Sequence, residues 1–305
     1  MYSYFDAHCD TMSKMYKQHL GLDSQELMVN TENLEGYERA VEVFALFNGG
    51  DMKKADMMSC FGFFKSECNR LSDKVTVCRT AKDIDENKAP LSAVLSIEGL
   101  GNQPDFKVAD IADFCDTGVR FISLSWNNDS ALCGGCDGDA GLTALGREAL
   151  SEMERHRIIL DVSHMSDRSF WESLECYSLP IVATHSVSRS VHTHRRNLTD
   201  EMFLEIARRG GVCGINFYPP FLCDGEADID TVIRHIEHFL SLGGEDNIGL
   251  GSDFDGIGTA PRGLECSAHI SRLAERLLAL NYREAVVEKI MHKNFLRVFE
   301  KFTVG

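Results

Sequence analysis

The 305-residue sequence lacks the features that would divide it into parts or place it in a membrane. It has no Pro/Gly/Ser-rich linker, low-complexity tract or short exact repeat, and it contains only 6 prolines. Its apolar runs are far shorter than the roughly 20 residues that cross a bilayer. The opening residues lack the basic start and long apolar core of a signal peptide. We therefore expect a single domain over residues 1–305, a cytoplasmic location and no membrane partner.

Basic residues are also scarce, because 31 Lys and Arg stand against 47 Asp and Glu, for a net charge of −16. Such an acidic chain is an improbable partner for nucleic acid. The 11 cysteines are an odd number scattered along the chain, which indicates reduced and mostly buried thiols. The C-x-x-C pair at 133–136 has no second pair with which to form a zinc ribbon, and no G-x-S-x-G nucleophile elbow is present.

Short runs rich in Val, Ile and Phe alternate with longer segments of helical period. Eight runs have strand character: 4–8, 40–47, 91–98, 119–126, 158–164, 181–186, 211–217 and 247–254. Helical period is found over 106–118, 142–156, 229–244, 265–280 and 283–302. Eightfold strand–helix alternation predicts a (β/α)8 TIM barrel. A doubly wound open sheet is the main alternative.

Polar residues stand where these runs end. They are His8 and Asp10, Asn48, Glu98, Trp126 and Asn127, His164, His185, Asn216 with Tyr218, and Asp253. In a barrel all the carboxyl ends meet at one mouth, whereas an open sheet would spread the same residues along a line. Three histidines and three acids exceed the three protein ligands of a typical single catalytic zinc, which indicates two ions that share a carboxylate.

Six segments also carry a resemblance to a known family, and they occur in the order that the family shows. They are DAHCDT (6–11), SIEGL (96–100), LDVSHMSD (160–167), ATHSVSRSVHTHRRNLTDE (183–201), GLGSDFDGI (249–257) and KNFLRVF (293–299). Together they resemble the membrane dipeptidase (renal dipeptidase-type) family of binuclear zinc peptidases, and in particular its soluble bacterial members. The resemblance covers nearly the whole chain.

The resemblance implies a cofactor of two Zn²⁺ per subunit. His8 and Asp10 match the ligands of one ion, and His164 and His185 match the ligands of the other. Glu98 matches the carboxylate that bridges the two ions together with a water or hydroxide. The resemblance further implies a homodimer.

The implied activity is that of a zinc-dependent dipeptidase, which hydrolyses free dipeptides through a metal-bridging hydroxide. Asp253 matches the acidic residue at the catalytic centre, where it would take the proton of the water and pass it to the leaving amine. Arg196 matches the arginine that clamps the terminal carboxylate of the dipeptide, a task that suits a planar guanidinium. Tyr218 falls near the substrate.

One position departs from the pattern of the family. Animal members have a histidine that contacts the substrate carbonyl, and here that position reads Trp126 within SLSWNND (123–129). A tryptophan offers one N–H donor and cannot take up a proton. Either Asn127 or another group polarises the carbonyl, or the substrate differs. The alternatives are thus an amidohydrolase for N-acyl amino acids or lactones on the same barrel, and a metal-binding barrel without catalytic activity.

Overall fold

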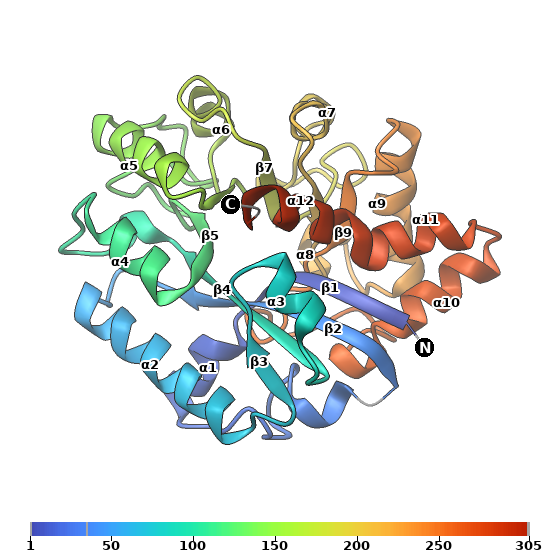
Figure 1. The fold of residues 1–305 in the computed structure, drawn as a ribbon. Helices are drawn as coiled ribbons and strands as arrows, with labels where there is room; N and C mark the ends of the chain where they lie inside the picture. The colour runs from blue at the N-terminus through green and yellow to red at the C-terminus, as the bar shows by residue number, and fades with distance from the viewer. Residues whose placement is uncertain (1, 35, 304–305) are drawn as a thin grey trace.

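The computed structural model describes residues 2–34 and 36–303. Within these residues nine strands form one sheet in which all the paired strands are parallel (Figure 1). They are β1 (Tyr2–Cys9), β2 (Tyr37–Phe47), β3 (Val75–Val77), β4 (Leu91–Glu98), β5 (Val119–Ser123), β6 (Ile159–Asp161), β7 (Ile181–Ser186), β8 (Cys213–Ile215) and β9 (Ile248–Leu250).

The sheet closes on itself, which confirms the predicted (β/α)8 barrel. The strand order is β2-β1-β9-β8-β7-β6-β5-β4-β3, and an additional pairing of β2 with β4 completes the ring. The short strand β3 was not predicted. It pairs with the first half of β4, opposite Leu91 to Ala93, and leaves the second half of β4 to pair with β5.

Helices surround the barrel and follow its strands, as Figure 1 shows. They are α1 (Thr11–Gln18), α2 (Lys54–Arg70), α3 (Ala81–Glu86), α4 (Asp110–Thr117), α5 (Ala144–Arg155), α6 (Asp167–Ser173), α7 (Asp200–Arg208), α8 (Pro219–Leu222), α9 (Ile229–Ser241), α10 (Ser271–Ala279), α11 (Glu284–Glu288) and α12 (Asn294–Thr303). Each of the five predicted helical segments contains at least one of them. Side-chain caps fix several starts; Thr199, for example, accepts a hydrogen bond from the backbone N–H of Met202. None of the helices in these ranges is long and apolar enough to cross a bilayer.

The last helix covers the end of the barrel that lies away from the candidate site. The Phe295 ring of α12 stacks on Phe5 at 5.6 Å, and Phe299 stacks on Phe121 at 6.0 Å. The buried amide of Asn294 donates hydrogen bonds to the carbonyl of Ile248, at the start of β9, and to that of Glu245, in the turn before it. Aromatic packing and satisfied backbone groups thus fasten α12 to the barrel.

The other end of the barrel carries the residues that the sequence singles out, and there the strands are shorter than predicted. Four of the predicted runs leave strand geometry early. The runs 119–126 and 158–164 do so three residues before their predicted ends, 247–254 four residues before, and 211–217 two residues before. Beyond β6 the N–H of Ser163 bonds the side chain of Asp161, and beyond β9 the backbone of Asp253 has φ +64°. Polar residues therefore lie on turns that continue from the strands.

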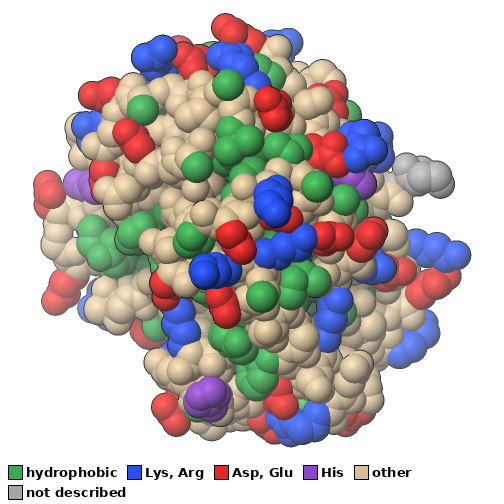
Figure 2. Space-filling model, turned by 90° about the vertical axis from the view of Figure 1, so that its left-hand side faces the viewer, with side chains coloured by type: hydrophobic (Ala, Val, Ile, Leu, Met, Phe, Trp, Pro, Cys, Tyr) green, Lys and Arg blue, Asp and Glu red, His purple; other side chains and the backbone are tan. Residues whose placement is uncertain are grey.

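Charged residues cover the outside. On the face that Figure 2 shows, Asp and Glu side chains are interspersed with Lys and Arg. On that face the two signs of charge are therefore mixed.

Candidate active site

The predicted ligands and the predicted catalytic acid come together at the carboxyl ends of five strands. His8 lies in β1 with Asp10 just beyond it, Glu98 ends β4, His185 lies in β7, and His164 and Asp253 each lie three residues beyond β6 and β9. Residues separated by up to 245 positions therefore share one mouth. The convergence follows from the closed barrel, because an open sheet would have kept these strand ends apart.

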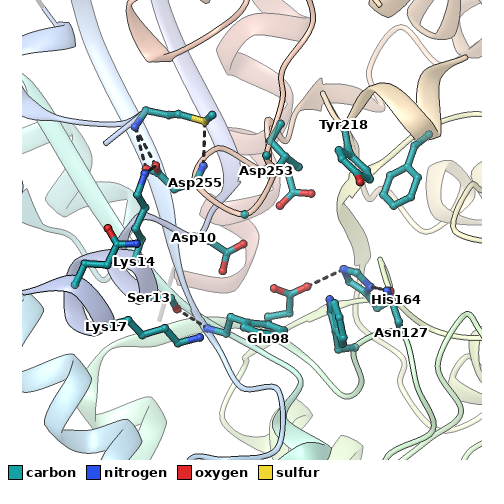
Figure 3. Close-up of a pocket in the computed structure, with 18 residues that line it drawn as sticks. Asp10, Ser13, Lys14, Lys17, Glu98, Asn127, His164, Tyr218, Asp253 and Asp255 are labelled. Atoms are coloured by element: carbon teal, nitrogen blue, oxygen red, sulfur yellow. Dashed lines mark hydrogen bonds and ion pairs between the residues drawn. The ribbon is translucent and has the colours of Figure 1, made fainter. Parts of the chain in front are cut away.

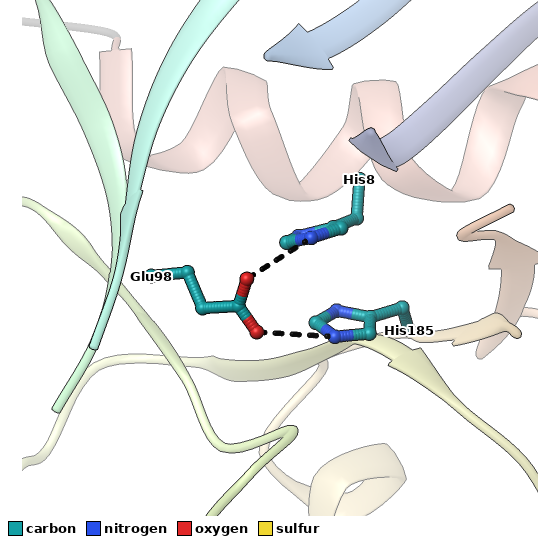
Figure 4. Close-up of side chains that lie close together, drawn as sticks. All are labelled: His8, Glu98 and His185. Atoms are coloured by element: carbon teal, nitrogen blue, oxygen red, sulfur yellow. Dashed lines mark ion pairs between the residues drawn. The ribbon is translucent and has the colours of Figure 1, made fainter. Parts of the chain in front are cut away.

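Glu98 occupies the centre of the group, and each of its oxygens faces different histidines (Figure 4). Its Oε2 lies 3.5 Å from His8 Nε2, while its Oε1 lies 2.7 Å from His164 Nε2 and 3.7 Å from His185 Nε2. Burial alone would raise the pKa of Glu98, but His164 and His8 hold it well below its usual value. Glu98 is therefore a carboxylate whose two oxygens address two sides of the site.

His164 and His185 point the same ring nitrogen at each other, with 3.0 Å between their Nε2 atoms. Their Nδ1 atoms are already engaged: that of His164 lies 2.8 Å from Asn127 Oδ1, and that of His185 lies 2.8 Å from Thr184 Oγ1. The Thr184 hydroxyl donates to Asp161, so it accepts from the His185 N–H. Burial lowers the pKa of both histidines, that of His164 to about 4, so both rings are neutral. Two unprotonated Nε2 atoms thus face one space, which suits a bound cation.

His8 supplies the second sign that a cation fits here. Its buried Nε2 has no hydrogen-bond partner among the described residues, although Asp10 and Glu98 each lie 3.5 Å away and Asp253 lies 3.9 Å away. Burial lowers the pKa of His8, but the two nearer carboxylates outweigh burial and raise it well above its usual value. One imidazole surrounded by three carboxylates is a donor set for a divalent ion such as Zn²⁺.

The described residues contain two groups of donors close enough to hold an ion. One is His8, Glu98 and His185, and the other is His8, Asp10 and Asp253. In the first group the His8 and His185 rings stack with their centroids 3.7 Å apart. The groups overlap in His8, so the division of ligands between two ions stays a prediction from the sequence.

Asp253 lies on the turn beyond β9 and is held from behind. Its Oδ2 accepts a hydrogen bond from Asn216 Nδ2 at 3.0 Å. Burial raises its pKa to about 7; His8 opposes this rise, and the carboxylates of Asp10 and Glu98 add to it. The turn brings the backbone of Gly256 so close that an added Cβ would lie 2.1 Å from Asp10 Oδ2 and 2.6 Å from Asp253 Oδ1. Only glycine leaves both carboxylates in place.

A cavity of about 570 Å³ opens over this group (Figure 3). It is lined by Asp10, Ser13, Lys14, Lys17, Gln18, Met28, Phe47, Glu98, Trp126, Asn127, His164, Tyr218, Phe221, Asp253, Asp255, Gly256, Ile257 and Gly258. Figure 3 shows Lys14 and Lys17 on one side of it and Tyr218, His164 and Asn127 on the other. The sequence-predicted residues Trp126, Asn127 and Tyr218 therefore border the same space as the acids and His164.

Arg196, the predicted carboxylate clamp, lies beside this cavity rather than in its lining. It is only 2% exposed, and its guanidinium donates to Ser186 Oγ and to the His185 carbonyl, each at 2.7 Å. The guanidinium also faces the Phe221 ring at 5.7 Å, and Phe221 does line the cavity. Its Nε–H has no partner, and no acid pairs with this arginine in the described ranges. A buried cation of this kind has donor capacity left for an anion.

Sequence reasoning missed the residues that support the site from the second layer. The Asp255 side chain is fully buried and accepts hydrogen bonds from Thr11 Oγ1 at 2.6 Å, Lys14 Nζ at 2.9 Å and the backbone N–H of Met28 at 3.0 Å. It thereby ties α1 and the following loop to the turn that carries Asp253. The second acid of the DFDG stretch was the available signal, since an acid in a buried turn needs partners.

The two remaining motifs lie around the site. The CGGC turn packs on the segment of His164, because the N–H of Cys136 donates to the His164 carbonyl at 2.9 Å. Both of its cysteines are free thiols, as are the other nine. His194, in the HTH stretch (192–194), lies in a loop, and its Nδ1 accepts a hydrogen bond from the backbone N–H of Arg196 at 3.1 Å.

Comparison with known proteins places these observations in a family. Residues 2–304 match the membrane dipeptidase family (peptidase family M19). An uncharacterized protein in the pqqA 5′ region of Klebsiella pneumoniae is 37% identical over 243 residues, which cover 74% of this chain and 89% of that protein. An uncharacterized dipeptidase of Schizosaccharomyces pombe is 34% identical over 229 residues, 70% of this chain; the match spans about half of that relative, 54% of its length.

Solved structures share the fold over nearly the full chain. One is described as a dipeptidase and metallopeptidase of family M19. It has a TM-score of 0.90 at 23% identity, and the match covers 99% of this chain and 99% of that one. A metallopeptidase from Rhodobacter sphaeroides, bound to a phosphinate mimic of the dipeptide L-Ala-D-Ala, has a TM-score of 0.88 at 22% identity, again with 99% of both chains covered. The chain therefore belongs to the membrane dipeptidase family, peptidase family M19, and is a peptide-bond hydrolase.

Proposed function

We propose that this chain is a zinc-dependent dipeptidase that cleaves free dipeptides. One observation carries the proposal: Glu98 turns one oxygen toward His8 and the other toward His164 and His185, whose Nε2 atoms lie 3.0 Å apart. This arrangement supports two Zn²⁺, with His8 and Asp10 on one side, His164 and His185 on the other, and Glu98 shared. The single domain, the homodimer and the cytoplasmic location stay predictions from the sequence.

When bound, two zinc ions supply Lewis acids for the scissile carbonyl and generate hydroxide from water near neutral pH. The residues of the chain then have separate tasks. Asp253 accepts the proton of the attacking water on its carboxylate and returns it to the departing amine. Asn216 keeps that carboxylate pointed at the site, because its amide donates to the outer oxygen.

A free dipeptide has a charged amino group at one end and a charged carboxylate at the other. The site offers a partner for the carboxylate. Arg196 is buried, has an unused Nε–H and has no acid beside it among the described residues, which supports its role as the partner of the terminal carboxylate. The R. sphaeroides structure binds a dipeptide mimic in a protein of the same fold, which is consistent with a substrate of this size.

The test combines metal content with activity. Purified protein is analysed for bound metal and assayed on D- and L-dipeptides, N-acyl amino acids and lactones, before and after chelation and again after zinc is restored. We expect dipeptides to be cleaved, activity to disappear on chelation and zinc to restore it. Preferential cleavage of acyl amino acids or lactones would replace the proposal with the amidohydrolase alternative, and a zinc-loaded protein inactive on the whole panel would refute it.

A further inference from the structure

Two lysines on α1 face the cavity, and they differ in their partners. Lys14 is bound on both sides, to Asp255 at 2.9 Å and to the Glu26 carbonyl at 2.7 Å. Lys17, one turn further along the same helix, also lines the cavity but forms no ion pair within the described residues. Among the cations that line the cavity, Lys17 is therefore the one with its charge available to a ligand.

The position of Lys17 is fixed by the helix and by an aromatic ring. Its Nζ lies 5.2 Å from the centre of the Phe47 ring, at the end of β2. Ser13, on the same face of α1, donates to the Ala45 carbonyl and accepts from the Phe47 N–H at 2.8 Å, which clamps the helix to β2. A lysine ammonium that lies over an aromatic ring keeps its charge, while its side chain has fewer accessible conformations. Binding an anion therefore costs little additional conformational entropy.

The place of Lys17 in the barrel decides which part of a dipeptide it would meet. In the ring β1-β2-β4-β5-β6-β7-β8-β9, strands β2 and β7 are four steps apart in both directions, so they lie opposite each other. Lys17 lies over the end of β2, and Arg196 bonds to the end of β7. If Arg196 holds the carboxyl-terminal end, the amino-terminal residue extends toward the side of Lys17.

We propose that Lys17 makes this enzyme selective for dipeptides whose amino-terminal residue has an anionic side chain, glutamate or aspartate. The inference rests on the proposed dipeptidase function and adds the substrate class to it. An exposed ion pair of this kind gives a preference of about two- to fivefold. The preference should shrink as salt is added, because exposed charges are screened.

The experiment compares isosteric substrates on the full, zinc-loaded protein. The ratio of kcat/KM for Glu-Ala over Gln-Ala measures the contribution of a negative charge on the amino-terminal side chain. The ratio for Ala-Glu over Ala-Gln measures the contribution of the same charge on the carboxyl-terminal side chain. We expect the first ratio to exceed about two in the wild type. It should fall to about one in Lys17→Met, which keeps an unbranched side chain over Phe47. It should fall below one in Lys17→Glu.

The control is Lys82→Met, which removes an exposed lysine from α3, at the end of the barrel that α12 covers. This variant should keep the wild-type ratio. A Glu-Ala preference that survives in Lys17→Met, or that is absent from the wild type, would overturn the inference. So would an equal loss on Glu-Ala and Gln-Ala in Lys17→Met, because Lys17 would then bind the backbone of every dipeptide. Failure of the wild type to cleave any of the four peptides would instead refute the dipeptidase function itself.

Discussion

Replacing Asn127 by alanine tests whether this residue serves the metal site or the substrate. Its Oδ1 lies 2.8 Å from His164 Nδ1 and also accepts from the Cys136 thiol at 3.3 Å. With that bond in place, His164 carries its proton on Nδ1 and presents a bare Nε2 toward Glu98 and the site. In Asn127→Ala the Nδ1–H of His164 loses its acceptor, although this residue is only 6% exposed.

An unpartnered buried donor costs about 1–3 kcal/mol. Loss of the group that orients a metal-binding histidine lowers metal affinity by about 10- to 100-fold, or about 1.4–2.8 kcal/mol. We therefore expect Asn127→Ala to weaken zinc binding by that factor, measured by competition with a chromophoric chelator. At saturating zinc, most of kcat should return.

Two matched variants make the result specific. Asn127→Asp retains an acceptor beside His164 and adds a negative charge, so it should bind zinc at least as tightly as the wild type. Asn128→Ala changes the exposed neighbour and should leave zinc affinity unchanged. Wild-type zinc affinity in Asn127→Ala together with a reduced kcat would refute this reasoning. It would favour the other hypothesis drawn from the sequence, in which Asn127 polarises the substrate carbonyl.

Four further predictions address other parts of the site. Asp253→Asn should retain both metals in elemental analysis and lose most of kcat, because the amide cannot take up a proton; wild-type turnover would remove this residue from the mechanism. Arg196→Lys should raise KM more than it lowers kcat, since a point charge replaces a two-pronged donor, and an unchanged KM for free dipeptides would contradict the assignment. Gly256→Ala should lower kcat at least tenfold with little change in thermal stability, because its methyl group displaces Asp10 and Asp253; full activity would show that the turn can move. Burial lowers the pKa of His235 to about 4, so between pH 6.5 and 4 the unfolded chain binds a proton at this residue that the folded chain does not. The free energy of unfolding, measured in urea, should therefore fall on acidification, by about 2 kcal/mol at pH 5. A His235→Gln variant with the same pH dependence would exclude His235 as the cause.

The fold could be predicted from the alternation of strands and helices, because the spacing of apolar residues can be read directly from one sequence. The eight barrel strands all overlap the eight predicted apolar runs. Strand β3 was not predicted because VTV is only three residues long, which is too short for its alternation to indicate a strand. The early ends of strands such as β9 escaped because they depend on turn conformations, including positive φ at Asp253 and Asp255.

The site was predictable only in its innermost layer. Imidazoles and carboxylates at strand ends stand out against an apolar background, so their convergence follows once a barrel is assumed. The partners that orient them, such as Asp161 behind Thr184, look like ordinary polar residues in the sequence. The same holds for Lys17, because the face that α1 turns toward the cavity depends on the Ser13 contacts with β2.

Trp126, at the position where the resemblance implies a histidine, and Lys17 both contact the Phe47 ring. The Trp126 ring packs edge-on against Phe47 at 5.2 Å and lies 6.3 Å from the His164 ring. The same Phe47 ring carries the Lys17 ammonium at 5.2 Å. A histidine at position 126 would add a proton-transferring group but would remove the large ring that supports Phe47, because an imidazole offers much less apolar surface. Trp126 therefore supports the ring over which Lys17 lies, and it offers one N–H donor but no group that can take up a proton.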